Sequence, residues 1–131
     1  DDTARAIEMI ENSSVEFEEL PDFPNKSTTD PTVWDLIMTE NRRESRELAR
    51  SINCSVMEDK ILCNRGVKTA RFYVLKWVDK PAVLVEIGFV TNSVEERNLK
   101  KAEYKEKLVQ AIVRGILNYK HRYEETRGFS S

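Results

Sequence analysis

One acidic side chain, Glu86, lies within the most apolar stretch of the sequence. This stretch, residues 82–89, reads Ala-Val-Leu-Val-Glu-Ile-Gly-Phe. Burial of an unpaired ionised carboxylate is costly, so a partner or a function must compensate. Ligands gather at the carboxyl ends of strands in α/β sheets, so a carboxylate there, beside a turn at Gly88, suits a general base or a metal-adjacent group. The alternative is a structural glutamate that points outward or pairs with Lys68 or Arg71.

Few residues of the chain could bind a metal through nitrogen or sulfur. The 131 residues include a single histidine, His121, and two cysteines, Cys54 and Cys63. This set cannot build a His-rich, four-cysteine or mixed Cys/His zinc site by itself. The cysteines are too far apart for a C-x-x-C motif, and they form either a short-loop disulfide or unpaired, mostly structural thiols.

Length and composition exclude several classes of protein. A chain of 131 residues holds at most one domain, and 40% hydrophobic with 34% charged residues excludes collagen-like, low-complexity and wholly disordered chains. With 21 basic and 23 acidic residues, the net charge of -2 argues against nucleic-acid binding. No apolar run approaches the roughly 20 residues of a membrane helix. The chain starts with Asp1-Asp2 and no Met, so we expect a processed or partial chain.

The first half of the sequence predicts helices around an irregular segment. Apolar spacing predicts a short amphipathic helix over residues 3–11. Prolines and a polar cluster predict irregular backbone over residues 15–30. Asp30 and Pro31 then suit the N-cap and first position of a helix, which runs to about residue 56 as one long helix or as two meeting near Asn41.

The second half predicts two strands followed by two helices. The strands are residues 72–75 and 82–89, and the second is apolar enough to be covered on both faces. The pattern Ser93-Val-Glu-Glu96 is a capping box that opens a short helix. An apolar stripe predicts a closing helix over residues 103–119, with a polar tail over residues 121–131.

These elements predict a fold class that the chain cannot complete alone. Two strands cannot shield a strand this apolar on both faces and both edges, and the predicted helices need a sheet to cover. The predicted class is therefore α/β, a single mixed, mostly parallel sheet covered by helices. Residues 1–131 would form its C-terminal part.

Three motifs occur in the order found in one enzyme family. They are Gly-Val-Lys-Thr-Ala-Arg-Phe-Tyr-Val-Leu (residues 66–75), Pro-Ala-Val-Leu-Val-Glu-Ile-Gly-Phe-Val-Thr-Asn (81–92) and Glu-Glu-Arg-Asn-Leu (95–99). With the closing-helix pattern from Tyr104 to Tyr119, they resemble the C-terminal half of the zinc-dependent N-acetylmuramoyl-L-alanine amidases. These are peptidoglycan hydrolases of the amidase 3 type, and the resemblance covers about residues 44–120.

The resemblance implies a function for Glu86 and a cofactor held elsewhere. Glu86 corresponds to the catalytic glutamate, and the substrate bond joins N-acetylmuramic acid to L-Ala of the peptidoglycan stem peptide. The family binds Zn²⁺ through two histidines and a glutamate, all upstream of the matched region and absent from this chain. The implied location is extracytoplasmic, in the periplasm or cell envelope. The alternative is a non-catalytic cell-wall binding or regulatory module derived from an amidase.

A second resemblance concerns regulation. Glu11-Asn12-x-Ser14 looks like a sequence in cell-division amidases, in which an inserted helix covers the active site until a protein activator displaces it. The likeness implies that residues 13–43 are a regulatory insert and that Glu11 is a resting-state zinc ligand. The alternative for Glu11 is a solvated glutamate at a helix end.

Overall fold

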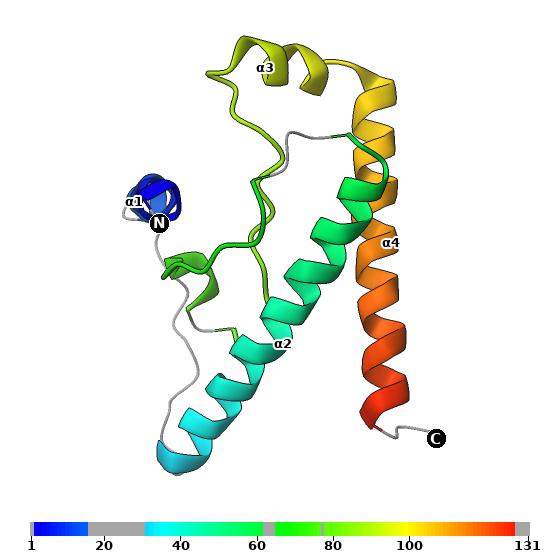
Figure 1. The fold of residues 1–131 in the computed structure, drawn as a ribbon. Helices are drawn as coiled ribbons and strands as arrows, with labels where there is room; N and C mark the ends of the chain where they lie inside the picture. The colour runs from blue at the N-terminus through cyan, green and yellow to red at the C-terminus, as the bar shows by residue number, and fades with distance from the viewer. Residues whose placement is uncertain (1, 16–30, 62–64, 77, 128–131) are drawn as a thin grey trace. The chain divides into compact units, whose positions relative to one another are not determined.

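The computed structural model describes residues 2–15, 31–61, 65–76 and 78–127, and these residues are largely helical (Figure 1). The helices are α1 (Asp2–Val15), α2 (Pro31–Glu58), α3 (Ser93–Leu99) and α4 (Ala102–Arg127), with a 3-10 turn, η1 (Tyr73–Leu75). The chain divides into two compact parts. The first comprises Asp1–Ser45 with Lys68–Val83, and the second comprises Arg46–Val67 with Leu84–Ser131, so α2 contributes to both.

The predicted sheet is absent from the part of the chain that the structure describes. Residues 72–75 contain η1 instead of a strand, and residues 82–89 have no regular secondary structure. Val85 and Ile87 are 39% and 42% exposed, whereas a strand covered on both faces would bury them. The α/β prediction of a mixed, mostly parallel sheet is therefore wrong. The apolar run suggested a strand, but a strand needs partner backbone groups to form its ladder, and the described residues supply none.

In the first part, the end of α1 is joined to η1 through one side chain. The Asn12 amide nitrogen donates to the Arg71 carbonyl at 2.8 Å, and the Tyr73 N–H donates to the Asn12 Oδ1 at 2.8 Å. Ala4, near the other end of α1, is 5% exposed. The helix predicted over residues 3–11 is thus confirmed, and it continues to Val15.

The structure resolves the two alternatives for the next helix in favour of one long helix. α2 passes through Asn41 without a break. Its exposed side carries mixed charges, such as Arg43, whose guanidinium lies 2.7 Å from the Glu40 carboxylate one turn earlier. Such pairs support a solvated helix face. The predicted N-cap Asp30 and most of the predicted irregular segment lie outside the described residues.

The core of the second part is the crossing of α2 and α4 (Figure 1). The Ser51 hydroxyl donates to the Gly115 carbonyl at 2.8 Å, and the Ser55 hydroxyl donates to the Ala111 carbonyl at 2.7 Å. A Cβ atom placed on Gly115 would lie only 2.5 Å from the Ile52 Cα. Small residues therefore let the two backbones approach each other, and the buried serine hydroxyls are satisfied across the contact.

The closing helix is longer than predicted. α4 continues to Arg127, past the predicted helix end at residue 119. The polar tail predicted over residues 121–131 stays a prediction, and residues 128–131 lie outside the described residues. Polar and aromatic pairs one turn apart support the extra turns. The Lys120 Nζ lies 3.7 Å from the Glu124 carboxylate, and the ring centres of Tyr119 and Tyr123 are 5.9 Å apart. A helix can persist without a buried face when such pairs follow one another.

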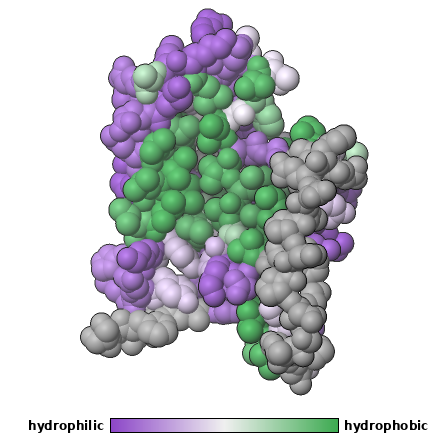
Figure 2. All heavy atoms as spheres, turned by 180° about the vertical axis from the view of Figure 1, so that it is seen from behind, coloured by the Kyte–Doolittle hydropathy of each residue, from purple (hydrophilic) through white to green (hydrophobic). Residues whose placement is uncertain are grey.

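α4 also carries a second apolar face. The face is formed by Val109, Val113 and Ile116, which are 55%, 46% and 42% exposed. Their spacing places them on one side of the helix, apart from the buried Leu108 and Ala111. Hydrophobic side chains also gather over a broad area of the surface seen from behind (Figure 2). None of the described helices is long and apolar enough to cross a membrane.

Candidate active site

Glu86 lies in the second part of the chain, on the segment that leads to α3. Its side chain is exposed, and the segment around it has no regular secondary structure. The prediction that this carboxylate is enclosed in a covered strand is therefore wrong, because no sheet forms around it among the described residues. Lys68 and Arg71 belong to the other compact part, so their pairing with Glu86 stays a prediction.

The turn that follows Glu86 is fixed by the start of α3. Gly88 has φ +141°, a backbone conformation that side chains rarely permit. The Asn92 N–H donates to the Phe89 carbonyl at 3.0 Å, which closes the turn. The Asn92 Oδ1 then accepts hydrogen bonds from the backbone N–H groups of Val94 and Glu95 at 3.0 Å and 3.2 Å. Asn92 is thus the N-cap of α3, and it satisfies two of the helix's first donors.

The predicted capping box is one residue out of register. Ser93 is the first helical residue and not the cap, and Glu96 pairs with Lys100 at 2.6 Å on the exposed side of α3. Asparagine is at least as good an N-cap as serine, so the chain caps one residue earlier. The acidic residue three positions after the true cap is Glu95. In a usual capping box it would reach back to the cap's own N–H, whereas here it reaches Phe89.

Both carboxylate oxygens of Glu95 are engaged. Oε2 accepts a hydrogen bond from the Phe89 N–H at 2.7 Å, and Oε1 lies 2.5 Å from the Arg65 guanidinium. The Arg65 guanidinium carbon also lies 4.7 Å from the centre of the Phe89 ring. The Arg65 hydrogen bond, followed by the Phe89 N–H, lowers the pKa of Glu95, although burial opposes them. We call Arg65, Phe89 and Glu95 the Glu95 clamp.

The charge of the Glu95 carboxylate also affects Tyr104 on α4. Tyr104 is half-buried near the start of that helix. Burial raises the pKa of the Tyr104 hydroxyl, and the negative charge of Glu95 raises it further. Tyr104 therefore stays neutral at physiological pH.

The described residues do not provide a metal centre. They contain no group of three or more His, Cys, Asp and Glu side chains that could hold a metal ion. Glu11 is half-buried on α1, in the other compact part from Glu86, so its role as a ligand stays a prediction. His121 is exposed on α4, with its Nε2 atom 3.6 Å from the Glu125 carboxylate. Cys54 is an exposed free thiol, and Cys63 lies outside the described residues.

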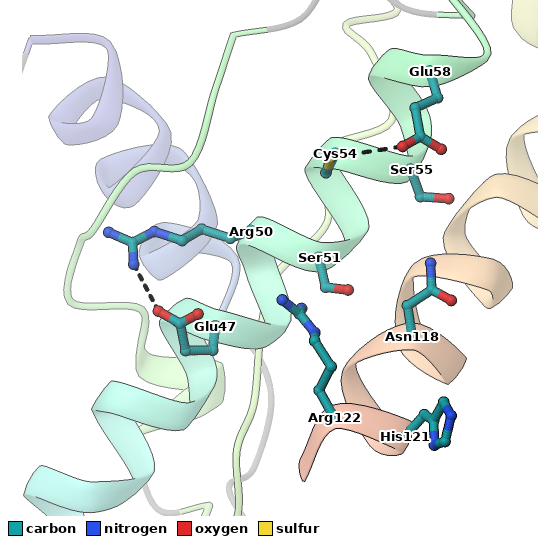
Figure 3. Close-up of a pocket in the computed structure, with 9 residues that line it drawn as sticks. All are labelled: Glu47, Arg50, Ser51, Cys54, Ser55, Glu58, Asn118, His121 and Arg122. Carbon is teal, nitrogen blue, oxygen red and sulfur yellow. Dashed lines mark hydrogen bonds and ion pairs between the residues drawn. The ribbon is translucent and has the colours of Figure 1, made fainter. Parts of the chain in front are cut away.

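The second part also contains a groove of about 570 Å³, which lies apart from Glu86 in that Glu86 is not among its lining residues (Figure 3). It is lined by Glu47, Arg50, Ser51, Cys54, Ser55, Glu58, Asn118, His121 and Arg122. Many of its polar groups already have partners. Arg50 lies 2.6 Å from Glu47, and the Ser51 and Ser55 hydroxyls donate to α4 carbonyls. The groove is a seam beside the helix crossing, and Glu86 does not line it.

Comparison with known proteins identifies the family. The family model of N-acetylmuramoyl-L-alanine amidase matches residues 23–118. The chain belongs to this family. This confirms the resemblance seen in the sequence, and the match includes the whole Glu86 segment and the Glu95 clamp.

Several relatives are named as amidases. The chain is 42% identical over 81 residues to the N-acetylmuramoyl-L-alanine amidase LytC of Bacillus subtilis, over 62% of this chain and 16% of LytC. It is 34% identical over 98 residues to the N-acetylmuramoyl-L-alanine amidase AmiA of Escherichia coli, over 75% of this chain and 34% of AmiA. The probable cell wall amidase LytH of Staphylococcus epidermidis is 32% identical over 80 residues, 61% of this chain and 27% of LytH. The matches thus span about a third or less of each relative, and no solved structure matches.

Sequence reasoning named Glu86 as the candidate base, which stays a prediction, and it missed the Glu95 clamp. The available signal was the pair Asn92 and Glu95, which is also a cap residue followed three positions later by an acid. Ser93 and Glu96, one residue later, have the same spacing and predict a different cap. Arg65 carries no local signal, because it lies thirty positions away in the sequence from the carboxylate it contacts.

Proposed function

We propose that this chain carries the general base of a peptidoglycan amidase, and that the intact protein hydrolyses the amide bond between N-acetylmuramic acid and L-Ala of the stem peptide. The observation that carries this proposal is the family match, which runs through the Glu86 segment. Glu86 is exposed there, beside a turn held by hydrogen bonds. The substrate is assigned from the family.

The proposed role of Glu86 follows from the chemistry of amide hydrolysis. A water molecule must lose a proton as it attacks the carbonyl carbon, and the departing amine must gain one. A single carboxylate within hydrogen-bond reach of both can accept the first proton and donate it in the second step. Because Glu86 is exposed, its carboxylate can meet a solvent water and a polymeric substrate without prior opening of a core.

The cofactor of the intact enzyme is proposed to be Zn²⁺. Zinc lowers the pKa of a bound water and polarises a carbonyl group. The described residues do not fit a zinc site by themselves, since no group of three suitable ligands occurs among them. We therefore assign its main ligands to other residues of the intact protein.

We infer that residues 1–131 are the C-terminal portion of one amidase catalytic domain. The matched region makes up 34% of AmiA, although it covers 75% of this chain. The second apolar face of α4 supports the same inference, because its three residues are 42% to 55% exposed. Covering apolar surface contributes about 25 cal/mol per Å² to stability. The remainder of the domain is proposed to cover such faces.

The proposed location is the cell envelope. Peptidoglycan lies outside the cytoplasmic membrane, and LytH is named as a probable cell wall amidase. An enzyme that acts on this polymer must be exported. We accordingly propose an extracytoplasmic protein, in the periplasm or the cell wall.

Regulation by an insert is a separate proposal. Residues 13–43 are proposed to restrain the active site until a protein activator displaces them, with Glu11 as a resting-state zinc ligand. Part of this segment is helical, since residues 31–43 form the first turns of α2. Deleting residues 15–40 from the intact enzyme should raise its basal activity. An unchanged rate in a folded deletion variant would argue against restraint by this segment.

The central test is a substitution of the proposed base in the intact protein. Glu86→Gln keeps the size of the side chain but removes its ability to accept a proton, so we expect kcat to fall by about 10² to 10⁴-fold. The assay is the release of new L-Ala amino groups from purified peptidoglycan, with zinc content measured in parallel. Glu96→Gln is the matched control, because Glu96 lies nearby on the exposed side of α3.

The outcomes separate an enzyme from a binding module. An inactive Glu86→Gln variant with normal zinc content, beside an active Glu96→Gln control, supports the proposal. A Glu86→Gln rate within threefold of the wild type would remove Glu86 from the mechanism. A zinc-loaded wild-type protein that binds peptidoglycan without cleaving it would instead establish a non-catalytic wall-binding module.

A further inference from the structure

The geometry points to Glu95 as a positioning residue that sets the place of the Glu86 carboxylate through the backbone of Phe89. This inference rests on the proposed function of Glu86. Glu95 would not touch the substrate, since Oε1 contacts Arg65 and Oε2 contacts the Phe89 N–H. It would act on the reaction only through the backbone that carries the base.

The Phe89 N–H is a backbone donor outside any β-ladder. Residues 81–89 have no regular secondary structure, so strand pairing does not satisfy the Phe89 N–H. The Glu95 carboxylate accepts this hydrogen bond at 2.7 Å. A hydrogen bond to a charged acceptor is roughly twice as strong as one between neutral groups. One side chain from α3 thus fixes the end of the segment that carries Glu86.

Glu95 is itself held by neighbouring groups. Its backbone N–H is bound by the Asn92 cap, and its side chain is only 14% exposed. The Arg65 guanidinium holds the other carboxylate oxygen and also stacks over the Phe89 ring at 4.7 Å. Arg65 therefore contacts both the acceptor and the residue that donates to it. The Glu95 carboxylate is thus held both by the Phe89 N–H and by Arg65.

Gly88 lies in the sequence between Phe89 of the Glu95 clamp and the segment that carries Glu86. Gly88 can rotate more freely than any residue with a side chain, and it is held at φ +141°. An added Cβ would lie 3.2 Å from the Glu95 Oε2, so this carboxylate packs closely against the glycine. Only Ile87 separates Gly88 from Glu86. Without the clamp, rotation at Gly88 would swing Glu86 relative to α3.

A small movement of the base is enough to affect the rate. Consecutive residues of an extended chain span about 3.3 Å each, so a rotation at Gly88 displaces a carboxylate two residues away by more than 1 Å. A misplacement of about 1 Å can cost about 10²-fold in rate. Loss of the clamp should therefore lower kcat strongly. It should change KM little, because the clamp makes no contact with substrate.

The test compares Glu95 variants with a neighbour on the same helix, in the intact zinc-loaded protein. Glu95→Ala removes the acceptor, and we expect kcat to fall by about 10- to 100-fold while KM stays within about twofold. Glu95→Gln keeps one acceptor oxygen but loses the charge, so its kcat should fall by a smaller factor of about 3 to 10. Glu96→Ala and Glu96→Gln are the matched controls, and their rates should equal the wild-type rate.

A second readout follows the backbone directly. Hydrogen exchange at the Phe89 amide should become about tenfold faster or more in Glu95→Ala and should stay unchanged in both Glu96 controls, because Glu95 is the acceptor of that N–H. If Glu95→Ala does not fold, Glu95→Gln carries both measurements. A purely structural role would lower the melting temperature without changing kcat of the folded protein.

The results separate this inference from the function on which it rests. Slower turnover of the Glu95 variants with faster Phe89 exchange supports the positioning role. Wild-type kcat in folded Glu95→Ala or Glu95→Gln, beside an inactive Glu86→Gln, overturns the positioning role and leaves the amidase proposal intact. An active Glu86→Gln variant would instead overturn the proposed base and the positioning role together.

Discussion

Substitution of Gly115 by alanine should loosen the second part of the chain at its core. An ideal Cβ there would lie 2.5 Å from the Ile52 Cα and 3.0 Å from the Ser51 carbonyl oxygen. Carbon atoms in contact lie about 3.5–4.0 Å apart, so α2 and α4 must separate by about 1 Å. The separation also lengthens the hydrogen bonds that Ser51 and Ser55 donate to α4 carbonyls.

The size of the effect follows from these opposing terms. Overpacking costs about 1–3 kcal/mol, and each weakened hydrogen bond about 0.5–1.5 kcal/mol. The better helix propensity of alanine offsets about 1 kcal/mol. We expect Gly115→Ala to lower the free energy of unfolding by about 2–3 kcal/mol, which corresponds to a shift of roughly 1 M in the urea midpoint.

The assay is urea unfolding of the intact protein, with Gly66→Ala as the comparison. Unlike Gly115, Gly66 has a positive φ, +77°, and outside its chain neighbours no atom lies within 4 Å of the position of an added Cβ. That variant should lose only about 1 kcal/mol from backbone strain. If Gly115→Ala were as stable as the wild type, the close approach of α2 and α4 would be refuted.

Three further predictions concern α3 and the surface of the second part. The partners of Glu95 lower its pKa in the folded protein. The clamp therefore contributes fully to stability above the unfolded pKa of Glu95, near 4.5, and this contribution is lost as the pH falls through the lower folded pKa. The difference in melting temperature between wild type and Glu95→Gln should accordingly shrink from pH 6 to pH 3. Asn92→Ala should cost about 1 kcal/mol in urea unfolding, whereas Ser93→Ala should cost almost nothing, and the reverse order would restore the cap predicted from sequence. Arg114→Ala should lower the urea midpoint slightly at low salt and less in 1 M NaCl, because the ion pair of Arg114 with Asp59, at 2.9 Å, is partly exposed and is screened by salt. A salt-independent loss would show that this pair is not the cause.

The helices were predictable because their signals are local. Apolar spacing alone predicted α1 and most of α4, and the proline at position 31 marks where α2 begins. Element ends were less predictable. α4 runs past Tyr119 on surface pairs such as Lys120 with Glu124, and such pairs leave no apolar stripe in the sequence. The α3 cap was missed by one residue, because two overlapping cap patterns compete at Asn92 and Ser93.

The predicted sheet failed for a reason that no local pattern reveals. Residues 82–89 have the composition of a buried strand, but composition supplies neither a second strand nor the backbone donors and acceptors of a ladder. In their absence the Phe89 N–H is bound by a side chain, Glu95. The sequence therefore identified the candidate base, Glu86, but not the structure that holds it. Arg65 and Glu95 meet only in the folded chain.

The two glutamates differ in what surrounds them, and this difference assigns their proposed roles. Both oxygens of Glu95 are occupied, and its partners keep its pKa low, so it stays ionised at the pH values where amide hydrolysis would run. Glu86 is exposed on the segment that Glu95 holds. In the proposed mechanism the proton taken from water is accepted by Glu86, whereas Arg65 and the Phe89 N–H engage the Glu95 carboxylate. The clamp would keep its charge, and with it the position of the base, through a whole catalytic cycle.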